Sequence, residues 1–152
     1  MYTIEEFDKE KTKVMNYIMY KKRTEFEVKN KFEKTIQKDL LCDIISYVKE
    51  AGYLDDNDYI KRAVQEFMAL KSLSIKEIKY KLYQKGIDKN KIDDFIYGNK
   101  EELEEYEIDS AKRIALKKER TMPKEEIEIF LLKKGYRQET IKEVLKWIMY
   151  WR

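Results

Sequence analysis

The side chains of this sequence that could do chemistry are mainly lysines and arginines, and they cluster where helical patterns end. Lys21, Lys22 and Arg23 directly follow the first such pattern. Clusters of this kind bind phosphate groups or acidic protein surfaces, although lysines at a helix C-terminus also complement the helix dipole, and both interpretations stay open. The candidate partner-binding or DNA-binding residues are Lys21, Lys22, Arg23, Lys61, Arg62, Lys71, Arg113, Lys117, Lys118 and Arg120.

Catalytic chemistry finds little support in the sequence. The chain contains no histidine, which excludes histidine-based acid–base catalysis and catalytic triads. It also has no glycine-rich phosphate-binding motif. The single cysteine, Cys42, falls in an apolar helical pattern, where we expect a small buried or half-buried thiol. We therefore expect no enzymatic activity, no cofactor and no zinc site.

Three aspartates close together, Asp55, Asp56 and Asp58, raise the question of a calcium site. A calcium-binding loop requires a glycine at its sixth position, and counting from Asp55 that position holds Ile60. An apolar helical pattern also begins too early for such a loop. We therefore expect these aspartates to cap the positive end of a helix instead of binding a metal.

The elements that must position these side chains are predicted to be helices, in three copies of one unit. The middle helix of each copy begins at a capping box or a proline, at Thr24, Ser74 and Pro123, and an apolar stripe follows each start. A period of about fifty residues is typical of repeat proteins. We predict an all-α fold of three tandem three-helix repeats that form an elongated, curved array. The predicted parts are a loosely held lead-in at 1–8 and units at 9–54, 55–105 and 106–152.

Glycines mark the ends of helices in this pattern. Gly86 and Gly135 each follow a lysine and precede a large side chain, as is typical of a left-handed helix C-cap. Gly52 ends the first unit, and we expect Tyr53 and Leu54 after it to be buried between the first two units. The structural motif residues are Gly52, Tyr53, Leu54, Asp55, Asp56, Gly86 and Gly135.

Composition and charge limit the possible classes of protein. Of the 152 residues, 43% are hydrophobic and 41% charged, which favours helices with large solvated faces. Basic residues exceed acidic ones in the first and third units, whereas acidic residues exceed basic ones in the second. The acidic run from Glu101 to Glu107 is predicted to be a linker or a solvated helix start, and the most flexible point. With no signal-peptide pattern and no long apolar run, we expect a cytoplasmic protein that does not contact a membrane. We also expect a monomer.

These motifs, in this order, resemble those of the RecX family. The resemblance is carried by Gly52-Tyr53-Leu54-Asp55-Asp56 and by the turns Lys85-Gly86-Ile87 and Lys134-Gly135-Tyr136. It extends from about Lys9 to Arg152. Where the family often has Arg-x-Arg-Ser, this chain has Lys21-Lys22-Arg23-Thr24, which keeps the charge and a capping hydroxyl.

The resemblance implies a regulator of the recombinase RecA. RecX proteins consist of three tandem three-helix repeats, bind the groove of the RecA–DNA filament, and inhibit ATP hydrolysis and strand exchange. The implied partner is the RecA filament, with weak contact to single- or double-stranded DNA, in DNA repair, recombination and the SOS response. The alternative is a helical-repeat nucleic-acid-binding protein without RecA specificity.

Overall fold

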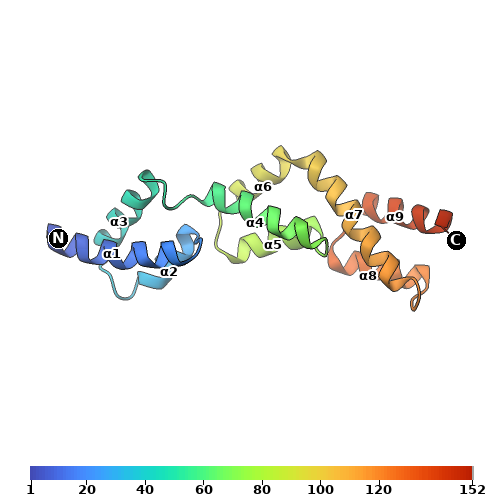
Figure 1. Ribbon diagram of the computed structural model, residues 1–152, viewed down its shortest axis with the longest axis horizontal. Helices are drawn as coiled ribbons and strands as arrows, with labels where there is room; N and C mark the ends of the chain where they lie inside the picture. The colour runs from blue at the N-terminus through green and yellow to red at the C-terminus, as the bar shows by residue number, and fades with distance from the viewer. Residues whose placement is uncertain (152) are drawn as a thin grey trace.

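In the part of the chain that the structure describes, nine α-helices form an elongated molecule with its first and last helices at opposite ends (Figure 1). This computed structural model describes residues 1–151, and Arg152, the last residue of the third predicted unit, lies outside the described residues. The predicted all-α fold is confirmed. The helices are α1 (Ile4–Tyr20), α2 (Glu25–Phe32), α3 (Lys38–Glu50), α4 (Asp56–Leu70), α5 (Ile75–Gln84), α6 (Lys89–Gly98), α7 (Lys100–Lys118), α8 (Lys124–Lys134) and α9 (Gln138–Trp151).

Three separate apolar cores divide these helices into consecutive groups of three. The first core joins α1, α2 and α3, and it includes Leu54 from the segment that follows. The second core joins α4, α5, α6 and the first turns of α7, and the third joins the rest of α7 with α8 and α9. The predicted grouping is therefore compatible with the structure, while the equivalence of the units as repeats stays a prediction. Within residues 1–151, no helix combines the length and the apolar character that crossing a bilayer requires.

The N-terminal lead-in that we expected to be loosely held is largely helical, so this prediction is wrong. Helix α1 begins at Ile4, and the side chain of Thr3 caps it. Phe7 packs against the first core, and the hydroxyl of Tyr2 donates a hydrogen bond to Asp43 on α3. The sequence pattern missed these contacts because the partners lie in a helix far along the chain.

Of the two structures predicted for the acidic run before the third unit, the helix start is confirmed and the linker is wrong. Helix α7 continues without a break through this run, and Leu103 and Tyr106 are buried in the second core. Glu107 has no exposed surface at all. Helix α7 therefore belongs to two cores, and the predicted boundary at 105/106 falls inside a helix instead of at a flexible point.

The segment that follows α3 turns as predicted but buries only one of its two large side chains. Gly52 adopts a left-handed φ of 82°, and the amide of Tyr53 donates a hydrogen bond to the carbonyl of Val48, which closes the helix. Leu54 is 3% exposed and completes the first core, whereas Tyr53 is 46% exposed. The expected burial of Tyr53 is therefore wrong.

A hydrogen bond from a capping hydroxyl joins each unit to the next. The hydroxyl of Thr24, which caps α2, donates to the carbonyl of Lys85 at the end of α5, at 2.7 Å. The hydroxyl of Ser74, which caps α5, donates to the carbonyl of Lys134 at the end of α8, at 2.8 Å. The carboxylate of Glu27 forms an ion pair with Lys85 in the first junction. The two junctions thus use the same atoms about fifty residues apart, a spacing typical of repeat proteins.

Glycine is required at both junctions because the neighbouring unit approaches the turn closely. Gly86 and Gly135 have left-handed φ values of 78° and 93°, as predicted for helix C-caps. A Cβ atom at Gly86 would lie 2.0 Å from the ring of Phe26, and one at Gly135 would lie 2.9 Å from the side chain of Lys76. Phe26 and Lys76 each occupy the second position of a capped helix in the preceding unit.

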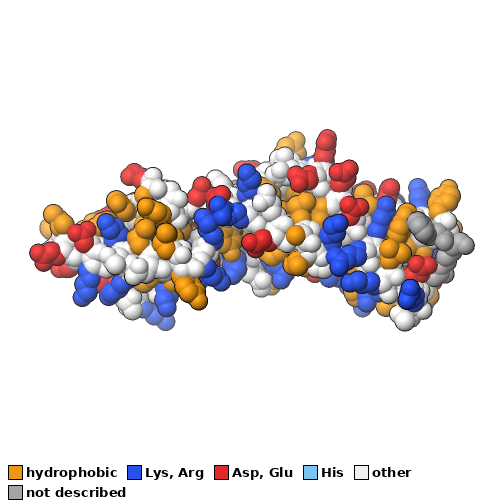
Figure 2. All heavy atoms as spheres, in the orientation of Figure 1, with side chains coloured by type: hydrophobic (Ala, Val, Ile, Leu, Met, Phe, Trp, Pro, Cys, Tyr) orange, Lys and Arg blue, Asp and Glu red, His pale blue; other side chains and the backbone are white. Residues whose placement is uncertain are grey.

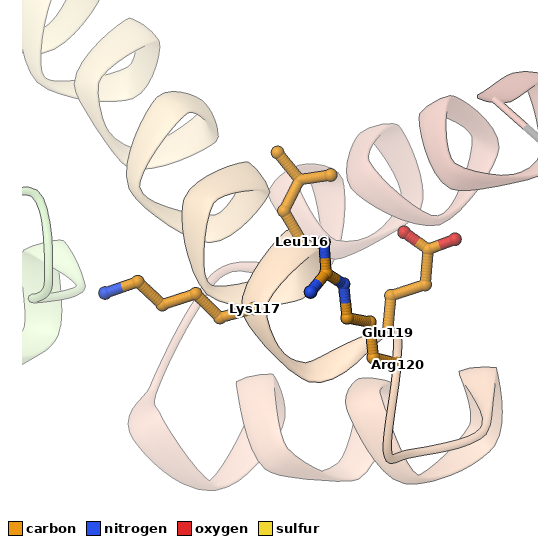
Figure 3. A pocket seen from close by; sticks show the side chains of 4 residues that line it. All are labelled: Leu116, Lys117, Glu119 and Arg120. Carbon is orange, nitrogen blue, oxygen red and sulfur yellow. The ribbon is translucent and has the colours of Figure 1, made fainter.

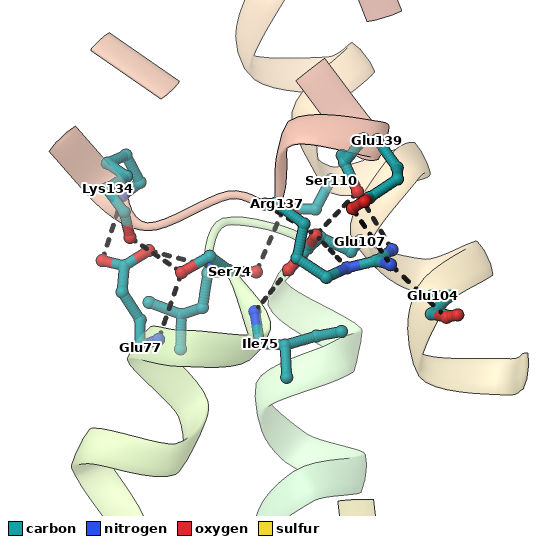
Figure 4. Close-up of polar contacts among 11 residues, drawn as sticks. Ser74, Ile75, Glu77, Glu104, Glu107, Ser110, Lys134, Arg137 and Glu139 are labelled. Atoms are coloured by element: carbon teal, nitrogen blue, oxygen red, sulfur yellow. Dashed lines mark hydrogen bonds and ion pairs between the residues drawn. The ribbon is translucent and has the colours of Figure 1, made fainter. Parts of the chain in front are cut away.

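The second junction contains a buried carboxylate that connects three segments (Figure 4). One oxygen of Glu107 accepts a hydrogen bond from the amide of Ile75, at 2.9 Å. The other accepts from the hydroxyl of Thr140 and from the side chain of Arg137, at 2.7 and 3.0 Å. Since Glu107 is fully buried, these bonds offset the cost of removing its charge from water. They fix α7 against the starts of α5 and α9.

We predict that Leu54 is essential to the first core and that Tyr53 is peripheral. Leu54→Ala removes a buried side chain and is expected to lower the free energy of unfolding by about 2–5 kcal/mol. Tyr53→Ala is expected to lower it by less than about 1 kcal/mol, because this ring is half exposed. Urea denaturation of both variants measures the difference, and equal losses would contradict the assignment.

We also predict that Glu107 holds the second and third units together. Glu107→Ala leaves the amide of Ile75 and the side chain of Arg137 without their partner, and it is expected to cost roughly 2–4 kcal/mol. Thermal unfolding should also become less cooperative, because the two units then unfold more independently. The control is Glu105→Ala, which changes an exposed carboxylate two residues earlier. If both variants unfold alike, the buried network does not couple the units.

Candidate partner-binding surface

Helix α4 connects the basic clusters that the sequence analysis identified. At its start, Asp58 receives two basic side chains on the same oxygen. Lys22, just beyond α1, approaches within 3.7 Å, and Arg62, one turn further along α4, lies at 3.0 Å. The end of α1 therefore lies beside the first turns of α4, and the clusters of the first and second units are neighbours.

The far end of α4 meets the third cluster. The guanidinium group of Arg113 on α7 donates a hydrogen bond to the carbonyl of Leu70, at 3.1 Å. Lys71 follows directly and adopts a left-handed φ of 49° at the C-cap of α4. Helix α4 has 15 residues and is therefore about 22 Å long. The first and third clusters thus lie at opposite ends of one helix.

The last part of the surface is a shallow hollow at the end of α7 (Figure 3). Leu116, Lys117, Glu119 and Arg120 line it, and Lys117 extends toward the second unit. We call the whole surface the basic strip. Its members, all exposed, are Lys21, Lys22, Arg62, Lys71, Arg113, Lys117 and Arg120.

Basic side chains are visible on one face of the molecule near the junction of the first and second units and again over the third (Figure 2). Lys21, Lys71, Lys117 and Arg120 form no ion pair with any residue that the structure describes. These charged groups are exposed to water. Each unit contributes at least one of them, so the strip runs along most of the array.

Three of the predicted binding residues do not belong to the strip. Arg23 is half-buried, with its guanidinium group 3.8 Å from the ring centre of Tyr17 and its Nε donating to the carbonyl of Tyr17. The ammonium group of Lys118 lies 4.2 Å from the ring centre of Phe130. Lys61 lines a separate hollow between α4, α6 and α7. Arg23 and Lys118 therefore stabilise the protein through contacts with aromatic rings.

Exposed apolar side chains beside the strip were missed by the sequence analysis. Tyr20 is 84% exposed, Leu70 62% and Leu116 49%. Tyr20 and Leu70 each directly precede a strip lysine, and Leu116 lies in the same hollow as Arg120. Their exposure could have been predicted from the sequence. Each of the three residues lies on the first helix of its unit, outside the stripe of apolar residues that faces the core. Together with the strip, they form a surface with both charge and apolar anchors, as protein interfaces require.

The three aspartates that we considered as a metal site are engaged separately. Asp55 caps α4 by accepting hydrogen bonds from the amides of Asn57 and Asp58, which confirms the predicted helix cap. Asp56 accepts from the amide of Glu25 in the first unit, and its burial raises the pKa of this carboxyl. In the described part of the chain, no three carboxylate or thiol side chains gather to hold a metal ion.

Cys42 is exposed on α3, so the expectation of a buried or half-buried thiol is wrong. Its neighbours Leu41 and Ile45 do face the core, at 6% and 4% exposure. The thiol lies just outside that stripe. A one-residue step along a helix rotates a side chain by about 100°, which is enough to turn Cys42 into solvent.

Curated proteins similar to this chain are named as regulatory proteins RecX. The protein of Finegoldia magna is 31% identical over 137 residues, which cover 86% of this chain and 67% of that protein. The protein of Clostridium botulinum strain Alaska E43 is 32% identical, and the match covers 61% of its length. The protein of Staphylococcus aureus strain JH9 is also 32% identical, and the match covers 50% of its length. The chain therefore spans about half to two thirds of their length. No protein-family model matches it.

Solved structures support the fold. The crystal structure of RecX from Lactobacillus salivarius superposes with a TM-score of 0.83 at 22% sequence identity, covering 95% of this chain and 97% of that one. A second crystal structure, of regulatory protein RecX, gives a TM-score of 0.78 at 22% identity, with 91% and 72% covered. The helical arrangement is thus shared with solved proteins of that name.

We predict that alanine substitutions distinguish the basic side chains that stabilise the fold from those that are exposed on the strip. Arg23→Ala removes a ring contact and a hydrogen bond, and it is expected to lower the free energy of unfolding by roughly 0.5–2 kcal/mol. Lys21→Ala, two residues earlier, is expected to change it by less than about 0.5 kcal/mol. Chemical denaturation measures both variants. A stability loss in Lys21→Ala equal to that in Arg23→Ala would contradict this division.

Proposed function

The chain belongs to the RecX family of regulatory proteins, and we propose that it regulates the recombinase RecA. In this proposal it binds the groove of the RecA–DNA filament and inhibits ATP hydrolysis and strand exchange. It acts as a monomer and without enzymatic activity. Its place is the cytoplasm, where it contributes to DNA repair, recombination and the SOS response.

The observation that carries the proposal is the basic strip with its apolar neighbours. A long array can contact several protomers of a filament at once, and contacts that are weak singly then add because they are linked. Lysines and arginines attract acidic protein surfaces or phosphates, while Tyr20, Leu70 and Leu116 supply the apolar anchors that phosphates cannot use. A filament of protein on DNA offers all of these partners.

A second candidate is a nucleic-acid-binding protein without RecA specificity. The strip itself favours it, because unpaired lysines and arginines bind phosphates of any sequence. The two candidate functions differ in whether the exposed apolar side chains take part in binding. A protein partner uses them, whereas binding to the backbone of naked DNA depends mainly on charge.

The proposal is tested by adding the full chain to RecA on single-stranded DNA. We expect the rate of ATP hydrolysis by RecA to fall as the protein is added, and the protein alone to hydrolyse no ATP. Sedimentation with filaments and with DNA alone measures binding in parallel. Binding to DNA alone that equals or exceeds binding to filaments would exclude RecA specificity and favour the second candidate.

The role of the strip is tested with one charge reversal in each unit. The triple variant Lys21→Glu, Lys71→Glu and Lys117→Glu breaks no ion pair of the described residues, so helicity should be preserved. We expect it to bind filaments about tenfold or more weakly and with a smaller dependence on salt, because fewer charges are screened or exchanged for ions. Binding is compared across salt concentrations after subtraction of the salt dependence of RecA itself.

The matched control is Lys9→Glu, Lys81→Glu and Lys146→Glu. It makes the same change of net charge, also at one exposed lysine per unit, away from the strip. We expect it to inhibit RecA nearly as well as the parent chain. If both triple variants lose binding to the same extent, net charge matters and the strip is not a defined site.

A further inference from the structure

A row of exposed apolar side chains lies on the middle helices of the three units. In Figure 1, α2, α5 and α8 follow one another along the molecule. The hydroxyl bonds of Thr24 and Ser74 join the starts of α2 and α5 to the ends of α5 and α8. The side chains of the row are between 42% and 62% exposed. We call this row the apolar ridge, and its members are Phe26, Tyr80, Tyr83, Ile129 and Leu132.

The ridge continues from α8 to α5 across the second junction. Leu132 lies one helical turn before Gly135, so the two positions share a face of α8. A Cβ atom at Gly135 would lie 2.9 Å from the side chain of Lys76, which therefore covers this turn. Tyr80 lies one turn after Lys76 on the same face of α5. The exposed side chains of the two helices thus follow each other along one line.

The outward face of α8 is unusual for a surface helix. Ile127 and Leu131 face the core of the third unit, whereas Ile129 and Leu132 are exposed on the opposite side. A surface helix normally has a single apolar face. The exposed pair occupies the sixth and ninth positions after the cap, and so do the two tyrosines of α5. A second apolar face on α8 indicates that another molecule covers it.

Charges beside the ridge have opposite signs in the second and third units. Lys79 directly precedes Tyr80, and Glu128 directly precedes Ile129, so the two charges lie on the same flank of the ridge. Glu128 forms no ion pair with any described residue. Lys79 has one ion pair, at 3.5 Å, with the exposed carboxylate of Asp93. A surface that complements the ridge therefore carries an acid beside α5 and a base beside α8.

We propose that the ridge pairs two copies of this chain in antiparallel orientation. A two-fold axis at the second junction places α5 of each copy against α8 of the other. Tyr80 and Leu132 then meet, because they lie four and three residues from the contact that joins the two helices. Tyr83 and Ile129 lie seven and six residues from this contact, so they meet as well.

The same axis brings opposite charges together. It lies in the interface and crosses the ridge, and it therefore keeps each flank of the ridge on its own side. Lys79 of one copy consequently faces Glu128 of the other, and this pair forms twice. Aromatic and aliphatic side chains in the centre with charges at the rim are typical of protein interfaces. The chain thus supplies both the order of apolar side chains and the charges that the ridge requires.

The two-fold axis also brings two like charges together, which keeps the pair weak. Lys76 lies on the ridge at the junction, so the ammonium groups of the two copies approach each other at the axis. Dilution therefore separates the copies, and the monomer remains the form that meets a filament under the function proposed above. The pairing itself does not depend on RecA or on the basic strip.

The first test measures the sedimentation velocity of the full chain over a range of concentrations. We expect the sedimentation coefficient to rise with concentration toward that of a dimer. Ile129→Lys places a charge in the ridge and is expected to raise the dimer dissociation constant about tenfold or more. The matched control is Met19→Lys, which changes a 67% exposed apolar residue of α1 away from the ridge. We expect the control to pair like the parent, and circular dichroism checks that both variants remain helical.

A second pair of variants tests the like charges at the axis. Lys76→Met removes the ammonium group and keeps a long side chain over Gly135. We expect it to lower the dissociation constant about threefold or more, because the repulsion at the axis is lost. Lys81→Met makes the same change at an exposed lysine of α5 away from the ridge and is expected to leave pairing unchanged.

The register is tested by disulfide crosslinking. Tyr83→Cys and Ile129→Cys are prepared as separate proteins, each with Cys42→Ser. We expect a mixture of the two proteins to form disulfide dimers about fivefold faster or more than either protein alone, because a disulfide requires the two Cβ atoms to be close. In the antiparallel pair each of these positions meets the other and not its own copy.

Three results would overturn the proposal. A parent chain that remains a monomer at its highest soluble concentration has no such pair. If Ile129→Lys nevertheless weakens binding to RecA filaments, the ridge contacts the filament instead. An equal loss of pairing in Ile129→Lys and Met19→Lys would show association through net charge. Crosslinking of either cysteine variant with itself as fast as in the mixture would exclude the antiparallel register.

Discussion

The array depends on one repeated interaction, the hydrogen bond from a capping hydroxyl to the end of a helix in the next unit. Thr24 and Ser74 each accept a bond from their own helix and donate one to the carbonyl of Lys85 or Lys134. One hydroxyl thus starts a helix and fixes a neighbour. The bond forms only if the neighbouring turn comes close, which is why a residue without a side chain is needed there.

The two junctions between units differ in the number and burial of their contacts. The first has the hydroxyl bond, one bond from the amide of Glu25 to Asp56, and exposed ion pairs, which contribute little in water. The second adds the buried Glu107 and a continuous helix, α7, that packs in both cores. The second and third units are therefore joined by more buried contacts than the first and second.

Basic side chains have two uses in this protein, and their surroundings decide between them. Arg23 and Lys118 lie over aromatic rings and stabilise their own units. Lys21, Lys71 and Lys117 have no such partner among the described residues and remain available to another molecule. Residues that are adjacent in the sequence, such as Lys117 and Lys118, point to different neighbours because a helix rotates each side chain away from the last.

The sequence by itself determined the all-α fold, the helix starts at Thr24 and Ser74, and the left-handed turns at Gly86 and Gly135, because caps, stripes and glycine turns are encoded over a few neighbouring residues. It did not determine that Glu107 is buried or that α7 is continuous. An acidic run is expected to be solvated, and only the tertiary structure brings Arg137 and Thr140 to this carboxylate. The sequence likewise identified the basic clusters but not how they are grouped on the surface. That grouping depends on contacts between residues far apart in the chain, because Lys22 contacts one end of α4 and Arg113 contacts the other.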